Sequence, residues 1–252
     1  MTADATASVG ETPFRIVARE SGHYRTDLPV WGALAPGSVA FESVGGSAGS
    51  QTVTRADIAG VPGAFQLIGL LTADECDRLI EIAEQLGFTD DAPVSLGRNV
   101  RHNDSFNWIV DESVDGPVWT RCETLFDETS YDGARPLGLN ARFRFYRYGA
   151  GDYFAPHTDG AWPGSRVIDG ELIVDAYGDR VSQMTFLIFL SDGYEGGRTL
   201  FQTDADQTIA VATPKGAALC FPHGFHPLHC VHAGERVTSG TKYIIRTDVL
   251  YG

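Results

Sequence analysis

The C-terminal part of the chain, residues 141–251, alternates short apolar segments with glycine-containing turns, and this pattern constrains the fold most strongly. We predict strands at residues 142–148, 153–159, 184–190, 198–202, 207–213, 216–222, 226–232 and 241–251. Many short strands with regularly spaced turn signals are typical of a sandwich or a barrel. The sequence therefore predicts a mainly β core.

Helical support is predicted ahead of this core, within residues 71–128. Residues 71–88 carry apolar side chains at helical spacing, which indicates an amphipathic helix. Thr72 and Glu75 have the spacing of a capping box at its start. A second helix is predicted over residues 116–128, where apolar side chains again follow a helical period.

The remaining segments show no clear period. Residues 1–60 are predicted to be an irregular N-terminal arm, and residues 61–252 a single domain. Within the arm, residues 43–52 are rich in Gly and Ser, which is typical of a flexible linker or loop. Residues 89–112 and 160–181 are polar, and we predict that both are irregular loops.

Charge and apolar patterning limit the expected partners. The formal net charge of −14 would repel a phosphate backbone, so we expect no nucleic-acid partner. No apolar run is long enough for a signal peptide or a membrane-spanning helix, so we expect a cytoplasmic protein without a membrane partner. The cysteines form no C-x-x-C pair and are expected to be reduced core residues: Cys76, Cys122, Cys220 and Cys230.

One predicted strand ends in an H-x-D pair, His157 and Asp159. Residues two apart on a strand point to the same face, so this imidazole and this carboxylate would share a cavity. A second imidazole would complete a two-histidine, one-carboxylate metal site. The candidates are His223, His226, His229 and His232, of which His223 and His226 are predicted to be surface or turn residues.

Three motifs, in this order along the chain, resemble those of the Fe(II)/2-oxoglutarate-dependent dioxygenases, specifically the prolyl 4-hydroxylase-like subfamily. They are Y-G-x-G-x-x-x-x-P-H-x-D at residues 148–159, G-G-x-T at 196–199 and H-A-x-x-x-V-x-x-G-x-K at 232–242. The resemblance implies a double-stranded β-helix, also called a cupin-like jelly roll, over residues 141–251. N-terminal helices would buttress this barrel.

The resemblance also implies a set of site residues. His157, Asp159 and His232 would hold Fe(II), and Lys242 would pair with the far carboxylate of 2-oxoglutarate. The hydroxyls of Tyr148 and Thr199 would donate hydrogen bonds to that carboxylate, which would satisfy a buried anion. Arg246 is a second candidate cation for the cosubstrate.

The implied activity is hydroxylation of an unactivated C–H bond of a small molecule, an amino acid or a peptidyl residue. It would use O2, release succinate and CO2, and take ascorbate as a further reductant. The carboxylate at Asp159 favours hydroxylation over halogenation, because related halogenases have Gly or Ala there. Phe154, Arg236 and the ending at residues 246–251 depart from the collagen-type enzymes, so a peptidyl-proline substrate is not implied.

Two other interpretations stay open at this point. The chain could be a non-catalytic metal-binding jelly roll that acts as a sensor or interaction module, or His157 and Asp159 could merely satisfy each other inside a core. The candidate substrate contacts come from the two polar loops: Arg98, Asn103, Asn107, Trp162 and Arg166. Nothing in the sequence indicates the oligomeric state.

Overall fold

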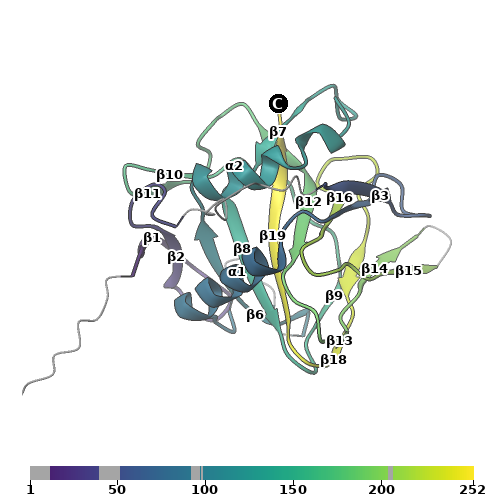
Figure 1. The fold of residues 1–252 in the computed structure, drawn as a ribbon, viewed down its shortest axis with the longest axis horizontal. Helices are drawn as coiled ribbons and strands as arrows, with labels where there is room; N and C mark the ends of the chain where they lie inside the picture. Colours follow the sequence, from purple (N-terminus) through teal and green to yellow (C-terminus); the bar gives the residue numbers. More distant parts are fainter. Residues whose placement is uncertain (1–11, 40–51, 92–96, 98, 204–206) are drawn as a thin grey trace, which may run out of the picture.

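The computed structural model describes residues 12–39, 52–91, 97, 99–203 and 207–252, which form two principal β-sheets with helices against the larger one (Figure 1). The larger sheet has ten strands, ordered β1 (Phe14–Glu20), β2 (Leu28–Ala33), β6 (Asp104–Ile109), β8 (Arg142–Tyr148), β19 (Lys242–Tyr251), β12 (Val181–Phe189), β16 (Ala218–Pro222), β4 (Phe65–Ile68) and β3 (Thr54–Asp57), with β7 (Pro136–Leu139) paired to β19. The smaller sheet has five, ordered β15 (Thr208–Val211), β14 (Thr199–Gln202), β17 (His232–Gly234), β9 (Tyr153–His157) and β5 (Arg101–His102).

Two apolar cores hold these layers together. The first lies between the sheets and includes Phe189 of the larger sheet and Phe201 of the smaller one. The second lies on the other face of the larger sheet, where α1 (Ala73–Leu86) and α2 (Glu112–Thr120) cover it (Figure 1). The predicted jelly roll with supporting helices is therefore confirmed.

Strand β8 shows how one sequence serves both cores. Phe143 and Phe145 pack in the core beneath the helices, whereas Tyr146 and Tyr148 belong to the core between the sheets. Successive side chains of a strand point to opposite faces, so Arg144 also faces the space between the sheets. The polar side of this strand therefore lines the interior of the jelly roll.

The capping box predicted at the start of α1 is confirmed. The Glu75 backbone N–H donates to Thr72 Oγ1 at 3.1 Å, and the Thr72 backbone N–H donates to Glu75 Oε2 at 2.8 Å. Arg121 also donates two hydrogen bonds to the Glu75 carboxylate, at 2.8 and 2.6 Å. The cap thus fixes the start of α1 and ties it to the segment after α2.

The prediction of an irregular arm over residues 1–60 is wrong for its described parts. β1 pairs with β2, β2 runs parallel to β6, and β3 pairs with β4. The pattern of β1 is weak because the strand lies at the sheet edge with most of its side chains at least partly exposed. The Gly/Ser segment 43–52 lies outside the described residues except for Thr52.

Both polar loops contain strands that the sequence analysis missed. In the first loop, β6 alternates apolar Phe106 and Trp108, which enter the core beneath the helices, with polar Ser105 and Asn107. In the second loop, β10 (Arg166–Ile168) and β11 (Glu171–Ile173) form a hairpin. Polar and half-exposed strands carry too few apolar residues to show a period of two.

A second helix is present as predicted, but it spans Glu112–Thr120 and not residues 116–128. α2 begins after Asp111, whose carboxylate accepts a hydrogen bond from the Ser113 backbone N–H at 2.9 Å. It ends at Thr120, and a 3₁₀ turn, η1 (Glu123–Leu125), follows. The start at residue 116 was wrong because the capping carboxylate at residue 111 lies outside the apolar pattern used to place the helix.

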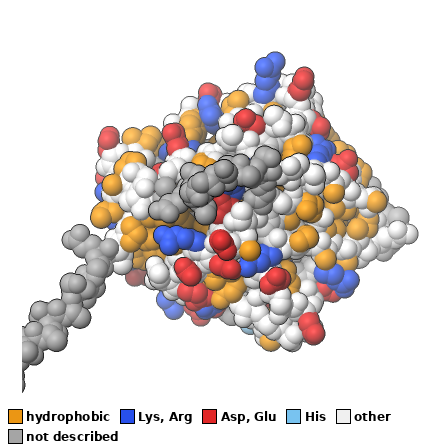
Figure 2. Space-filling model, viewed as in Figure 1, with side chains coloured by type: hydrophobic (Ala, Val, Ile, Leu, Met, Phe, Trp, Pro, Cys, Tyr) orange, Lys and Arg blue, Asp and Glu red, His pale blue; other side chains and the backbone are white. Residues whose placement is uncertain are grey.

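The described surface carries both signs of charge. Figure 2 shows Asp and Glu side chains interspersed with Lys and Arg over one face of the molecule.

Two short strands, β13 (Glu195–Gly196) and β18 (Val237–Ser239), pair at the end of the β-sandwich. Among the described residues, no helix is both long and apolar enough to cross a membrane.

Candidate active site

Three side chains that could bind a metal meet between the sheets. His157 ends β9, Asp159 follows two residues later, and His232 begins β17 directly opposite His157 in the strand register. His157 Nε2 lies 3.7 Å from Asp159 Oδ1, and His232 Nε2 lies 3.6 Å from Asp159 Oδ2. Their potential ligand atoms all lie within 4.8 Å of one another, which is close enough to share one ion.

Backbone carbonyls orient both imidazoles for metal binding. His157 Nδ1 donates to the Ala155 carbonyl at 2.8 Å, and His232 Nδ1 donates to the Cys230 carbonyl at 3.3 Å. These bonds fix the tautomer and leave each Nε2 lone pair directed at Asp159. Burial lowers the pKa of His157, and it lowers the pKa of His232 to about 4. Both rings are therefore neutral at pH 7, the form that binds metal ions.

The Asp159 carboxylate is held in its ionised form. Burial alone would raise the pKa of Asp159, but Arg246, the two histidines and a 2.6 Å hydrogen bond from Thr185 Oγ1 outweigh it and hold the pKa well below its usual range. The 3.7 Å separation of His157 and Asp159 is too long for a hydrogen bond. The interpretation in which these two side chains merely satisfy each other is therefore wrong.

A buried hydrogen-bond chain supports Asp159 from behind. His223 lies 2.8 Å from Thr185 Oγ1 through Nδ1 and 2.8 Å from Ser182 Oγ through Nε2. The Thr185 hydroxyl donates its only proton to Asp159, so its oxygen accepts the hydrogen bond from His223 Nδ1. The prediction that His223 is a surface or turn residue is wrong, since it is 1% exposed. His226 is only partly buried, at a turn after β16.

Lys242 lies in the same pocket as the three side chains. It is 3% exposed, and its ammonium donates to the Gly197 carbonyl at 2.5 Å. Burial lowers the pKa of Lys242 to about 8. The Lys242 ammonium forms no ion pair with any carboxylate of the described residues. Tyr148 and Thr199 line this pocket as well. The pocket therefore combines an unpaired buried cation with two hydroxyl groups.

Arg246 lies in the pocket but already has anionic partners. Its guanidinium is 3.3 Å from Asp159 Oδ1 and 3.1 Å from Asp248 Oδ1. Arg144 on the neighbouring strand contacts the other oxygen of Asp248 at 3.1 Å. Two arginines thus share Asp248, and Arg246 links that pair to the candidate metal site.

The predicted substrate contacts lie in different places. Asn107 and Trp162 line a second cavity beside the candidate metal site. Asn103 is buried, and its Oδ1 has no hydrogen-bond partner among the described residues. Arg98 lies outside the described residues.

Arg166 lines neither the metal-site pocket nor the second cavity. It donates to Asp115 of α2 at 3.1 and 2.5 Å and to Tyr177 Oη at 2.7 Å. These bonds tie β10 to the helical layer. A substrate role of Arg166 stays a prediction, and the structure does not support it, because the buried Asp115 carboxylate already pairs with this guanidinium.

Comparisons with known proteins agree with this geometry. Residues 143–247 match the model of the 2OG-Fe(II) oxygenase superfamily, and this stretch contains the three motifs. Residues 143–247 therefore carry a domain of this superfamily. The chain is a 2-oxoglutarate-dependent oxygenase that uses Fe(II) and O2, and the non-catalytic module is not supported. No curated protein sequence matches the chain significantly.

One solved structure shares the fold of this chain, and two others resemble it less closely. A Trichoplax adhaerens prolyl hydroxylase, solved with a peptide of hypoxia inducible factor, is 14% identical with a TM-score of 0.52, over 74% of this chain and 83% of that one. A collagen prolyl hydroxylase of Paramecium Bursaria Chlorella virus-1 is 19% identical with a TM-score of 0.49, over 75% and 96%. A Pseudomonas putida prolyl-4-hydroxylase is 13% identical with a TM-score of 0.49, over 74% and 91%.

Sequence reasoning missed several residues of this oxygenase site. They surround the motif residues: Thr185, His223 and Asp248 behind Asp159, and Arg101, Arg142, Arg144 and Tyr146 along the second cavity. For β8 a signal existed, because residues 142–148 place two Arg and two Tyr on one face, and two Phe and one Arg on the other. For His223 no such signal exists, because its partners come from distant strands.

Proposed function

We propose that His157, Asp159 and His232 hold Fe(II) and that the enzyme hydroxylates a C–H bond of a small polar substrate. Two neutral imidazoles and one ionised carboxylate suit a ferrous ion and leave coordination positions for other ligands. The hydrogen bonds from Nδ1 of each histidine support this assignment, since they direct the free Nε2 atoms to one point.

The observation that carries the proposal is the unpaired ammonium of Lys242 in the same pocket. A buried cation needs an anionic partner, and the far carboxylate of 2-oxoglutarate would supply it. Tyr148 and Thr199 would donate hydroxyl hydrogen bonds to the same carboxylate. Arg246 is less suited to this task, because Asp159 and Asp248 already neutralise it.

When bound, iron and 2-oxoglutarate supply the oxidation, which couples release of succinate and CO2 to insertion of oxygen into the C–H bond. The protein orients the ligands and keeps bulk water from the pocket. Ascorbate would serve as an additional reductant. A cytoplasmic location is also part of the proposal, supported by four free cysteines.

The test measures succinate formed from 2-oxoglutarate in the presence of Fe(II), O2 and ascorbate. We expect His157→Ala and His232→Ala to abolish both metal binding and succinate release, since each removes one of three ligands. Lys242→Met is expected to leave metal binding intact and to weaken 2-oxoglutarate binding at least tenfold. His229→Ala is the matched control, because this exposed histidine lies three residues from His232 outside the pocket.

Two results would contradict the assignment. Metal affinity that is unchanged in His157→Ala would exclude the triad as the iron site. Binding of 2-oxoglutarate that is unchanged in Lys242→Met would exclude Lys242 as its anchor and leave Arg246 as the remaining cation.

A further inference from the structure

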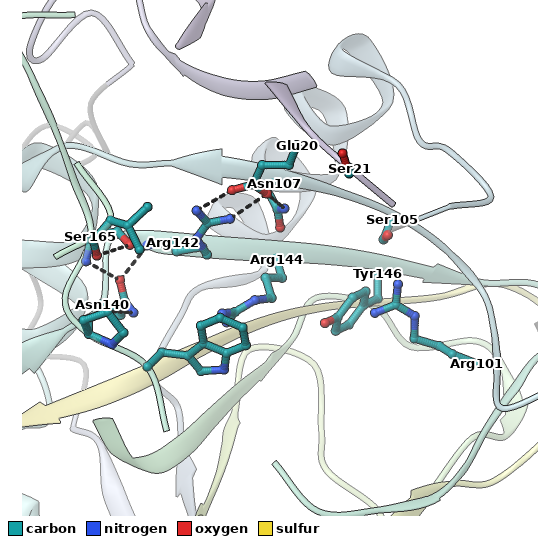
Figure 3. Close-up of a pocket in the computed structure, with 13 residues that line it drawn as sticks. Glu20, Ser21, Arg101, Ser105, Asn107, Asn140, Arg142, Arg144, Tyr146 and Ser165 are labelled. Atoms are coloured by element: carbon teal, nitrogen blue, oxygen red, sulfur yellow. Dashed lines mark hydrogen bonds and ion pairs between the residues drawn. The ribbon is translucent and has the colours of Figure 1, made fainter. Parts of the chain in front are cut away.

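Figure 3 shows the residues that line a second cavity, which has a volume of about 250 Å³. Its wall combines β8 with β6, the end of β1 and the segment around Trp162. Tyr146 lines this cavity as well as the metal-site pocket, so the two spaces meet at one side chain. A substrate placed here would lie next to the proposed iron.

One row of register partners across the larger sheet runs from the metal-site pocket to the second cavity. Arg246 of the metal-site pocket is the direct register partner of Arg144, which is in turn the partner of Asn107. Residues directly opposite on neighbouring strands have adjacent side chains on the same face of the sheet. The row through Arg144 therefore connects the second cavity to the guanidinium that contacts Asp159.

Three arginines line the second cavity, and two of them are already paired. Arg142 donates two hydrogen bonds to Glu20, at 3.0 and 2.7 Å (Figure 3). Arg144 contacts Asp248 at 3.1 Å. Arg101 is different. Its guanidinium forms no hydrogen bond or ion pair with the residues that the structure describes, although the residue is only 8% exposed.

Arg101 is positioned where the two cavities join. Its guanidinium carbon lies 5.6 Å from the ring centre of Tyr146 and 5.9 Å from that of Phe154. The Phe154 ring stacks on His157, with 3.7 Å between ring centres. The unpaired charge of Arg101 is thus separated from a proposed iron ligand by one aromatic ring.

From this arrangement we propose that the substrate carries a carboxylate that pairs with Arg101, while the carbon to be oxidised faces the metal site. The inference rests on the proposed function, since it names the substrate class of the same site. A guanidinium without an ionic partner, in a residue that is only 8% exposed, favours binding of an anion, and its planar fork matches a carboxylate in a two-point contact.

Charge and size narrow the ligand further. Of the cations that line this cavity, Arg101 alone lacks a carboxylate partner within the described chain, which matches one negative charge better than a phosphate dianion. The volume lies below the range of about 300–1,000 Å³ typical of pockets for drug-sized ligands. The Asn107 side chain adds a polar group on the wall. A small carboxylic acid fits these features better than a peptide chain.

The test uses full-length protein loaded with Zn(II), which is redox-inert, and with saturating 2-oxoglutarate. Propionate and its neutral analogue propionamide are then titrated while the side-chain Nε–H signals of arginine are followed by ¹⁵N NMR. We expect a saturable shift of the Arg101 signal with propionate and none with propionamide. Arg101→Gln should weaken propionate binding at least tenfold, and Arg101→Lys should retain part of it.

Arg135→Gln is the control, because this exposed arginine lies outside both cavities. Equal binding of propionate and propionamide, or propionate binding that Arg101→Gln leaves unchanged, would overturn the inference. Tighter binding of methyl phosphate than of propionate would overturn the choice of a carboxylate. Loading with 2-oxoglutarate distinguishes a failure of the proposed function from a failure of the inference about Arg101. Failure of 2-oxoglutarate to bind rejects the proposed function, whereas normal loading without discrimination between the probes rejects only the role of Arg101.

Discussion

At the scale of single residues, the site depends on side chains that position other side chains. Thr185 is fully buried and donates to Asp159 Oδ2 at 2.6 Å, while His223 fixes the direction of that hydroxyl. Arg246 contacts the other carboxylate oxygen. Asp159 is therefore held from two sides before any metal arrives.

We predict that Thr185→Val weakens metal binding by about 10- to 100-fold, the usual effect of removing a hydrogen bond to a metal ligand. Metal titration of the apo-protein measures this change. Thr185→Ser should restore most of the affinity, because it keeps the hydroxyl. Thr213→Val serves as control, since this buried threonine bonds Gln66 instead. An unchanged affinity in Thr185→Val would show that the hydroxyl does not position Asp159.

The lowered pKa of Lys242 predicts how 2-oxoglutarate binding depends on pH. Only the ammonium form pairs with a carboxylate, and burial places its pKa at about 8 in the free protein. In Zn(II)-loaded protein, the apparent Kd for 2-oxoglutarate should be nearly flat below pH 8 and rise about tenfold per pH unit above it.

Lys242→Arg provides the comparison, because a guanidinium stays charged throughout this range. Its curve should lack the rise above pH 8, whatever its absolute affinity. Calorimetry between pH 7 and 9.5 measures both curves. Identical slopes in the two proteins would show that another group causes the pH dependence.

The motif residues could be predicted from the sequence because their spacing is local. His157 ends β9 and Asp159 follows it two residues later, while Lys242 begins β19 only ten residues after His232. Arg101 could not be predicted in this way. Its importance depends on the absence of a carboxylate near its guanidinium, and only the folded chain determines that.

At the scale of elements, predictability followed the strength of the apolar pattern. Strands β12 and β16 and the helix α1 bury largely apolar sets, so their patterns are visible in the sequence. The strand predicted over residues 226–232 is wrong, because this segment contains turns and β17 begins only at His232. β6 and the β10–β11 hairpin were missed because polar side chains occupy much of their surface. In β6 the polar side chains Ser105 and Asn107 face the second cavity. Because polar residues occupy these positions, the apolar alternation that would predict a strand is weak.

The capping box of α1 gives a prediction at this scale. Thr72→Ala removes the acceptor for the Glu75 backbone N–H and should reduce the free energy of unfolding by about 1 kcal/mol. Thr72→Ser should stay close to wild type, because it retains the hydroxyl. Urea unfolding with an unchanged m-value measures the difference. A larger loss, well above 2 kcal/mol, would mean that the Glu75–Arg121 pair had also been broken.

At the scale of the whole molecule, the second cavity draws on parts of the chain that lie outside the superfamily match. The superfamily match spans residues 143–247 and contains the proposed iron and cosubstrate residues. The second cavity also needs Glu20, Arg101 and Asn107, which precede that span. We expect changes in substrate preference to map to the N-terminal strands and changes in cosubstrate binding to map to the jelly roll.

Ligand loading should stabilise the whole fold. At 2-oxoglutarate concentrations of about 100 times Kd, linkage adds about 2.7 kcal/mol to the free energy of unfolding. For a chain of this size that corresponds to a rise in Tm of roughly 5–10 °C in Zn(II)-loaded protein. Thermal unfolding followed by circular dichroism measures the shift. Lys242→Met should show almost none at the same ligand concentration, and a full shift in that variant would contradict the proposed anchor.

The parallel pairing of β2 with β6 has a consequence for synthesis. A ribosome completes β2 at residue 33, but the partner strand begins only at residue 104. At about 5–20 residues per second, the β1–β2 hairpin waits roughly 4–14 s with one edge open. An open strand edge is a template for pairing with other chains. The edge of β2 is therefore open to such pairing until β6, which forms part of the wall of the second cavity, has been synthesised.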